Sequence, residues 1–158
     1  MIKKILYLTF LIQLFVSCGF TPTYKVSNNQ DSSSIYYEID PSSSYIARQI
    51  LNSLIENLDK DEAKFLITVQ IIENESAVNV DSSGSVNEYK IEVLINFEII
   101  NMNNDTILYK SQSRGFSNFD VSNSEYANTL SRNEALEKAL MEVVQLMNIK
   151  IQNRINEL

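Results

Sequence analysis

Cys18 is the one residue of this chain whose type and position suggest covalent chemistry, because it is the only cysteine. The 158 residues contain no His and no Trp. Catalytic Ser-His and Cys-His pairs, imidazole metal sites and His-based pH switches all require histidine, so these kinds of site are excluded. A single cysteine also cannot close a disulfide within the chain. We therefore expect no catalytic residues, no metal and no cofactor, and we look to Cys18 for a covalent modification.

Glutamates are the remaining candidates for acid–base chemistry. Glu73, Glu75, Glu88 and Glu98 supply enough carboxylates for the pair that a cell-wall hydrolase needs. They alternate with apolar residues, which is the pattern of a hydrated sheet face. An enzyme of this kind is our third hypothesis, and two of these side chains crowded into one pocket would revive it.

The N-terminal residues have the pattern of a signal peptide. Lys3 and Lys4 precede an apolar run over residues 5–16. Twelve helical residues rise only about 18 Å, which is less than the thickness of a bilayer's hydrocarbon core. The sequence therefore predicts a signal peptide over residues 1–17.

The end of this segment resembles a bacterial lipobox, at which a dedicated peptidase cleaves before a cysteine that has received a diacylglycerol. Phe15, Val16 and Ser17 precede Cys18, and Phe15 stands where Leu is usual. The resemblance implies peptidase recognition through these residues and Gly19, and a lipid anchor in the membrane at the acylated Cys18. By resemblance to enterobacterial sorting rules, Gly19 in place of Asp permits export to the outer membrane, on its periplasmic side.

Composition separates the rest of the chain into a tether and one domain. Residues 18–34 are rich in Ser, Asn and Gln and suit a tether behind the lipid. Residues 35–158 are enough for a single folded domain. With 13 Lys and Arg against 20 Asp and Glu, the chain has a net charge of -7. We expect no nucleic-acid partner, because phosphate backbones require clustered cations.

Hydrophobic periodicity predicts the first elements of this domain. Ile35–Ile39 forms a short strand. Asp40 as N-cap and Pro41 at the first helical position then open a helix of about sixteen residues. Its apolar face consists of Ala47, Ile50, Leu51, Leu54 and Leu58. The strand Lys64–Ile72 follows, and the polar residues 73–79 fray, twist or continue half exposed toward a turn at Asp81–Gly84.

The clearest periodicity lies between Glu88 and Ile99, where apolar and polar residues alternate strictly. This predicts a long strand with one hydrated face. A turn at Asn101–Asp105 leads into a return strand, Thr106–Ser113, and thus an antiparallel hairpin. Phe116, Phe119 and Val121 extend the apolar surface beyond that strand.

The C-terminal third is predicted to be helical. Capping boxes at Ser122 and Ser131 allow a short helical turn before a longer helix, or one continuous helix. The apolar stripe of this helix consists of Leu136, Ala139, Leu140, Val143, Met147, Ile151 and Ile155.

The order of elements predicts an α+β two-layer sandwich with the order β-α-β-β-β-α. Two amphipathic helices pack on one face of a mixed, mostly antiparallel sheet. A right-handed crossover through the first helix joins the first strand to a neighbour, and the last three strands form a meander.

Two short motifs resemble those of a known family. Residues 18–24 (CGFTPTY) are similar to the C-G-F-x-P-x-Y opening of the alphaproteobacterial LPS-assembly lipoproteins, the LptE family. Residues 124–127 (SEYA), followed by Glu134 and Ala135, resemble the S-x-Y-A motif and Ala-rich helix that close those proteins. The resemblance implies a non-enzymatic lipoprotein that plugs the lumen of the outer-membrane β-barrel LptD, the translocon that inserts lipopolysaccharide into the outer leaflet.

One property of that family does not transfer directly. Lipopolysaccharide contact is ascribed there to basic residues near the turn between the second and third strands, but Asp81–Gly84 contains no Lys or Arg. Our hypothesis is that lipid contact is weak, or is displaced to Lys90, Lys110 or Arg114. The alternative is that these three are solvated charges on a strand.

A pilot or accessory lipoprotein for another outer-membrane machine, such as a secretin, is the second hypothesis of the binding class. It shares the small size and the anchor, so only the two motifs favour LptD as the partner.

Overall fold

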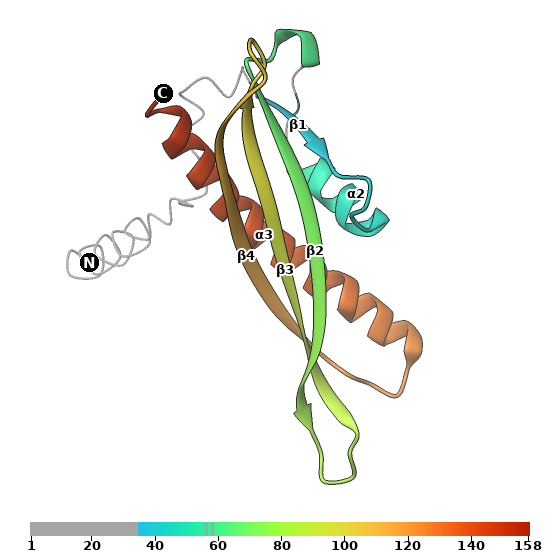
Figure 1. Ribbon diagram of the computed structural model, residues 1–158. Coiled ribbons are helices and arrows are strands. Elements are labelled where there is room, and N and C mark those ends of the chain that lie inside the picture. The colour runs from blue at the N-terminus through green and yellow to red at the C-terminus, as the bar shows by residue number, and fades with distance from the viewer. Residues whose placement is uncertain (1–34, 56, 58) are drawn as a thin grey trace, which may run out of the picture. The chain divides into compact units, whose positions relative to one another are not determined.

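The computed structural model describes residues 35–55, 57 and 59–158 (Figure 1). The signal peptide and tether predicted for residues 1–34 lie outside the described residues. The elements are β1 Ile35–Ile39, α2 Tyr45–Leu54, the short 3-10 helix η2 Lys60–Glu62, β2 Phe65–Val80, β3 Val86–Asn101, β4 Thr106–Asp120 and α3 Glu125–Ile155. The predicted α+β class and the order β-α-β-β-β-α are confirmed.

The four strands form one mixed sheet in the order β1-β2-β3-β4. β1 runs parallel to β2, and α2 lies between them in the chain. β2, β3 and β4 are antiparallel neighbours, so they form the predicted meander. The register aligns Ile39, Val69, Phe97 and Ser111 across all four strands.

The core lies between one face of the sheet and the two helices. On β3, the alternating residues from Ile91 to Ile99 are buried, as the periodicity predicts. α2 contributes Ala47 and Leu51, and both helices lie behind the sheet in Figure 1. α3 buries Ala135, Leu136, Ala139, Leu140, Val143, Val144, Met147 and Ile151, which reproduces most of the predicted stripe. The opposite face of the sheet carries no helix in the described part of the chain.

α2 begins later than predicted, and Asp40 is not its N-cap. The Asp40 Oδ1 atom accepts a hydrogen bond from the Ser42 N–H at 2.8 Å, and the Ser43 N–H donates to the Asp40 carbonyl. These bonds form a turn that delays the helix to Ser44, whose Oγ accepts from the Ala47 N–H at 3.2 Å. The helix has ten residues instead of about sixteen because the chain becomes extended at Ile55.

α3 is one continuous helix of 31 residues, so the second of the two open alternatives holds. Its N-cap is Ser124, whose Oγ accepts from the Ala127 N–H. The predicted cap, Ser122, instead donates its N–H and hydroxyl to Asn128 Oδ1. Ser131 lies inside the helix.

β2 follows the predicted alternative in which residues 73–79 continue the strand toward the turn, whereas β4 is longer than predicted. β2 continues to Val80, although all residues from Asn74 onward are exposed, and β4 continues to Asp120. Backbone pairing with β3 sustains both extensions. Pairing does not need an apolar side chain, which is why the side-chain pattern placed the end of β4 too early and left the end of β2 open.

Candidate functional site

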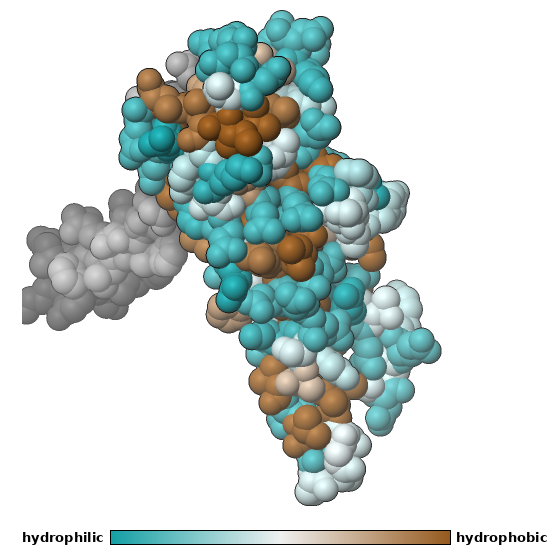
Figure 2. Space-filling model, in the orientation of Figure 1, coloured by the Kyte–Doolittle hydropathy of each residue, from teal (hydrophilic) through white to brown (hydrophobic). Residues whose placement is uncertain are grey.

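The candidate site is the sheet face opposite the helices, which we call the uncovered face. Side chains of successive strand residues point to opposite faces, so the uncovered face carries Glu88 to Ile100 of β3 at alternate positions and their partners on β2 and β4. Figure 2 shows this face as hydrophilic bands that separate hydrophobic patches.

Two adjacent rows of polar side chains cross the middle of the uncovered face. The first row contains Glu38, Thr68, Glu98 and Lys110, one from each strand. The second row contains Gln70, Asn96 and Gln112. Within the rows, Lys110 Nζ lies 2.6 Å from Glu98 Oε1, and Asn96 Nδ2 donates to Gln70 Oε1 at 3.2 Å.

These rows line an open groove of about 770 Å³, to which Asp40 and Pro41 contribute the end beyond β1. The hydrogen bond from the Ser42 N–H lowers the pKa of Asp40 below its usual value, so its carboxylate is charged at neutral pH. The groove therefore offers amides, a hydroxyl and charges of both signs. It is suited to polar contacts over a broad area.

Apolar patches flank the polar rows. On the uncovered face, Leu66, Ile100 and Ile107 lie beside the first row, and Ile72 and Leu94 lie beside the second row. Val78 and Val80 lie near the β2–β3 turn, where the register shifts. Ile107, Val78 and Val80 are each about half exposed. A surface that mixes apolar and polar groups in this way resembles the composition of protein interfaces.

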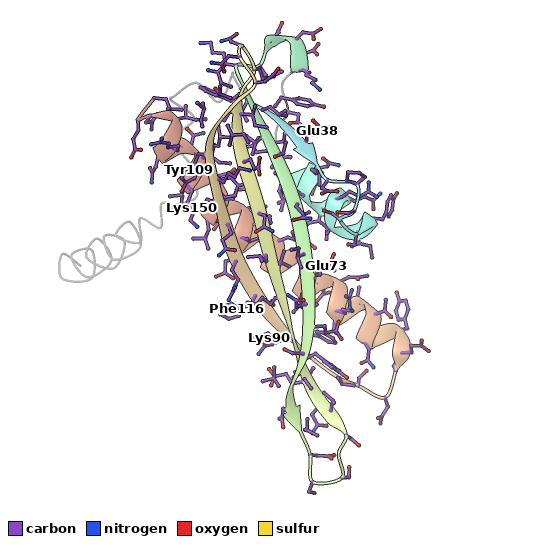
Figure 3. The ribbon with its side chains drawn as sticks, viewed as in Figure 1. Glu38, Glu73, Lys90, Tyr109, Phe116 and Lys150 are labelled. Carbon is purple, nitrogen blue, oxygen red and sulfur yellow. The ribbon has the colours of Figure 1, made fainter. Side chains whose placement is uncertain are left out.

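The three predicted cations all lie on the uncovered face (Lys90 is labelled in Figure 3), but they are spread along it, with about 27 Å between the strand positions of Lys90 and Lys110. Lys110 pairs with Glu98, and Arg114 Nε lies 3.0 Å from Glu92 Oε1. Lys90 lies opposite Ser76 and Asn118, and no ion pair of Lys90 occurs among the described residues. Two of the three cations thus already have carboxylate partners on β3. Exposed pairs of this kind contribute little to stability, but they leave less positive charge for a phosphate.

The turn at Asp81–Gly84 is confirmed and is acidic. Gly84 adopts a φ of 87°, which a residue with a side chain rarely adopts. Asp81 Oδ1 accepts from the Ser83 hydroxyl and from the N–H groups of Ser83 and Ser85. These hydrogen bonds, above all that of the Ser83 side chain, lower the pKa of Asp81.

The four glutamates proposed for an acid–base pair do not form one cluster: Glu73 and Glu75 lie together on the helix-covered side of β2, outside the groove. Glu73 and Glu75 both contact Arg132 of α3, with Arg132 Nε 2.8 Å from Glu75 Oε2. Glu88 and Glu98 are ten residues apart on β3, which is about 34 Å along a strand. Among the described residues, no group of three His, Cys, Asp or Glu side chains could hold a metal ion.

The predicted lipidation site lies outside the described residues, and so do the peptidase-recognition residues. These are Cys18 with Phe15, Val16, Ser17 and Gly19. In the part of the chain that the structure describes, no helix has the length and apolarity to span a bilayer.

Sequence reasoning identified the hydrated face of β3 but missed the groove. Glu38, Asp40 and Gln112 join Asn96 and Glu98 only through the register of four strands. The parity of each strand could have placed them on the uncovered face. The register itself depends on turns and bulges, including the shift between Ile99 and Ile100, that no local pattern revealed.

No family model matches the sequence, and no curated protein matches it. Solved structures do share its fold. A candidate lipoprotein from Caulobacter crescentus CB15 is 15% identical with a TM-score of 0.62, over 79% of this chain and 92% of that one. An uncharacterized lipoprotein B from Nitrosomonas europaea is 14% identical with a TM-score of 0.54, over 73% and 79%. A minor lipoprotein from Acinetobacter baumannii is 10% identical with a TM-score of 0.50, over 75% and 94%.

Proposed function

We propose that the chain is a lipid-anchored outer-membrane protein that acts as plug and assembly partner of the lipopolysaccharide translocon barrel LptD. Its role is non-enzymatic, and it supports insertion of lipopolysaccharide into the outer leaflet. The lipobox resemblance at Cys18 and the similarity in fold to proteins called lipoproteins support the anchored part of the proposal. The motifs at residues 18–24 and 124–127 support the choice of LptD.

The uncovered face is the observation that carries the plug role. A plug must place a broad surface against a barrel wall whose lumen is polar. Both helices pack on the other side of the sheet, so the whole width of four strands is available for this contact. The centre of this face carries three amides, Gln70, Asn96 and Gln112. Hydrogen bonds from these amides to a polar wall can replace the ones that they make to water.

The internal ion pairs make such a contact less costly. An unpaired charge that a partner covers loses its hydration without compensation. Glu98 with Lys110 and Glu92 with Arg114 enter the interface as paired units. The barrel wall therefore needs no matching charge opposite each of them.

Co-purification tests the proposal. The full chain is extracted from membranes in mild detergent, and the barrel that accompanies it is identified by mass spectrometry. We expect LptD, and we expect Asn96→Arg to reduce its recovery at least tenfold, because the new charge lies at the centre of the uncovered face. The matched control is Gln145→Arg on the exposed side of α3, which should leave recovery unchanged.

Two outcomes contradict the proposal. Recovery of a secretin ring in place of LptD would indicate the pilot role instead. Equal recovery with both arginine variants would show that the uncovered face does not contact the barrel.

A further inference from the structure

The outer edge of β2 is paired with another strand over only part of its length. β1 pairs with Phe65–Val69, and the described part of the chain places no strand beside the remaining eleven residues of β2. The Asp40 N–H donates to the Val69 carbonyl, and the Ile71 N–H donates to Ser43 Oγ. Alternate residues of a strand direct their N–H and C=O to the same side. The backbone groups of Glu73, Glu75 and Ala77 therefore line the same edge, which we call the β2 edge.

The β2 edge lacks the protection that the opposite edge of the sheet has. At β4, the Phe116 N–H donates to Glu142 Oε2 at 3.0 Å, and Lys150 Nζ donates to the Gln112 carbonyl, so α3 side chains occupy backbone groups of that edge. No side chain of the described residues occupies the N–H groups of the β2 edge in this way. Its residues 73–80 include no Pro and no Lys, which are usual edge blockers. The carboxylates of Glu73 and Glu75 contact Arg132 of α3 instead, and Glu73 Oε1 also accepts a hydrogen bond from the Ser44 hydroxyl.

The surface beside the β2 edge is also incomplete. The Tyr37 hydroxyl of β1 donates to Asn148 Oδ1 of α3, so β1 covers that side of the helix. Leu130 and Tyr126 lie about five and six helical turns before Asn148 and thus on the same side of α3. They are 50% and 81% exposed, and in Figure 1 the first turns of α3 extend past the end of β1. A strand that continued the line of β1 would cover them.

The charge around this edge indicates the kind of partner. Residues 73–90 and 116–132 contain six carboxylates against two cations, Lys90 and Arg132. A second copy of the chain would bring like charges together, which disfavours a symmetric pairing of two β2 edges. An extended segment with basic residues is complementary to this charge.

We infer that the β2 edge binds an extended, basic segment of a partner protein by strand addition. Backbone hydrogen bonds to Glu73, Glu75 and Ala77 hold the segment. Its Lys or Arg side chains lie beside Glu73 and Glu75, whose two carboxylates share the single cation Arg132 and so keep a net negative charge. An apolar side chain of the segment lies over Leu130. This surface differs from the uncovered face, so the inference goes beyond the plug role and does not depend on the identity of the barrel.

The probe is a fluorescein-labelled eight-residue peptide of alternating Lys and Val, added to the full chain in detergent. We expect saturable binding by anisotropy, with amide hydrogen exchange slowed at least tenfold at residues 73–77. Ala77→Pro removes an edge N–H and should weaken binding at least tenfold. The matched control is Asn118→Pro. Asn118 is exposed on β4, at the opposite edge of the sheet, so this variant should bind the peptide as the wild type does.

Several results would overturn the inference. These are equal binding by Ala77→Pro, equal binding of a peptide of alternating Glu and Val, or exchange protection on β4 instead of β2. Protection of residues 73–77 in a dimer without peptide would identify a second copy as the occupant. If Ala77→Pro does not fold, the exchange map of the wild-type chain decides, because it requires no substitution.

Discussion

Gly115 of β4 lies directly against the backbone of α3 at Ala139. A Cβ atom at residue 115 would overlap the Ala139 carbonyl oxygen and would lie 3.0 Å from the Val143 nitrogen. This contact sets how closely the long helix approaches the sheet. Because neither backbone can yield locally, a side chain here must push the helix away from the core.

We predict that Gly115→Ala lowers the free energy of unfolding by about 1–3 kcal/mol, the usual cost of overpacking. Urea unfolding of the full chain in detergent measures the change. Ser117→Ala on the same face of β4 is the matched control and should change stability by less than about 0.5 kcal/mol. Equal stability of Gly115→Ala and the wild type would show that α3 is not held at this distance.

Because of Tyr37, the free energy of unfolding should fall at high pH. Burial raises the pKa of its phenol to about 12 in the folded chain, from the ordinary value of 10.0 for tyrosine. The folded state therefore binds the proton more tightly than the unfolded state does. Its contribution is fully present below pH 10 and is lost as the pH rises through the folded pKa, by about 2–3 kcal/mol in total.

The test compares unfolding free energies of the wild type and Tyr37→Phe between pH 9 and pH 11.5. Below pH 10 we expect Tyr37→Phe to be less stable by about 1 kcal/mol, because the hydrogen bond to Asn148 is lost. Above pH 10 the difference should shrink, since only the wild type must keep a buried phenol protonated. Parallel pH curves would contradict this assignment.

Ser44 is the N-cap of α2, and we predict that its hydroxyl stabilises the start of this helix. Its hydroxyl caps the Ala47 N–H and also contacts Glu73 of β2. Ser44→Ala should cost about 1 kcal/mol of unfolding free energy, which is typical for an N-cap. Pro41→Ala is the control, because Pro41 precedes the helix. If Pro41→Ala lost more unfolding free energy than Ser44→Ala, the helix would begin near Asp40, as the sequence predicts.

These elements show what the sequence could and could not predict. The alternation from Ile91 to Ile99 and the stripe around Leu140 reflect burial, which hydrophobic periodicity reports directly. The start of α2 depends on a competition between Asp40 and Ser44 for backbone N–H groups, and both residues are good caps. The tertiary bond from the Ile71 N–H to Ser43 Oγ stabilises the turn before Ser44, and it joins residues 28 positions apart. No local pattern contains that information.

The candidate site was predictable to a similar extent. Lys90, Lys110 and Arg114 were placed on strands, and the structure adds that all three share one face. The pairing of Lys110 with Glu98 and of Arg114 with Glu92 depends on the β3–β4 register, which hairpin length and a bulge determine. The exposed β2 edge could not be predicted, because the sequence left open whether residues 73–79 fray or continue the strand.

Lipopolysaccharide binding is predicted to be weak and to depend on Lys90. Lys110 and Arg114 already contact carboxylates, so Lys90 has the least competition for a phosphate group on the uncovered face. Lys90→Gln should reduce the affinity of the full chain for purified lipopolysaccharide two- to fivefold, and Lys110→Gln should change it less. Ultracentrifugation with labelled lipopolysaccharide in detergent measures both. A larger loss on changing the turn, as in Ser82→Ala, would instead place lipid contact at residues 81–84.

The lipid anchor predicted at Cys18 gives the most direct test of where the protein is located. A thioether to diacylglycerol requires the Cys18 sulfur, and serine cannot replace it. One acyl chain binds a bilayer only marginally, whereas two or three make release negligible. We therefore predict that Cys18→Ser loses metabolic labelling with palmitate and is no longer processed at residue 17.

If lipidation is needed for assembly, the amount of mature barrel should fall as well. Ser27→Ala in the predicted tether is the control and should keep both the label and the membrane attachment. Membrane attachment of Cys18→Ser equal to that of the wild type, with the leader removed, would show that the chain is held at the membrane by something other than this residue.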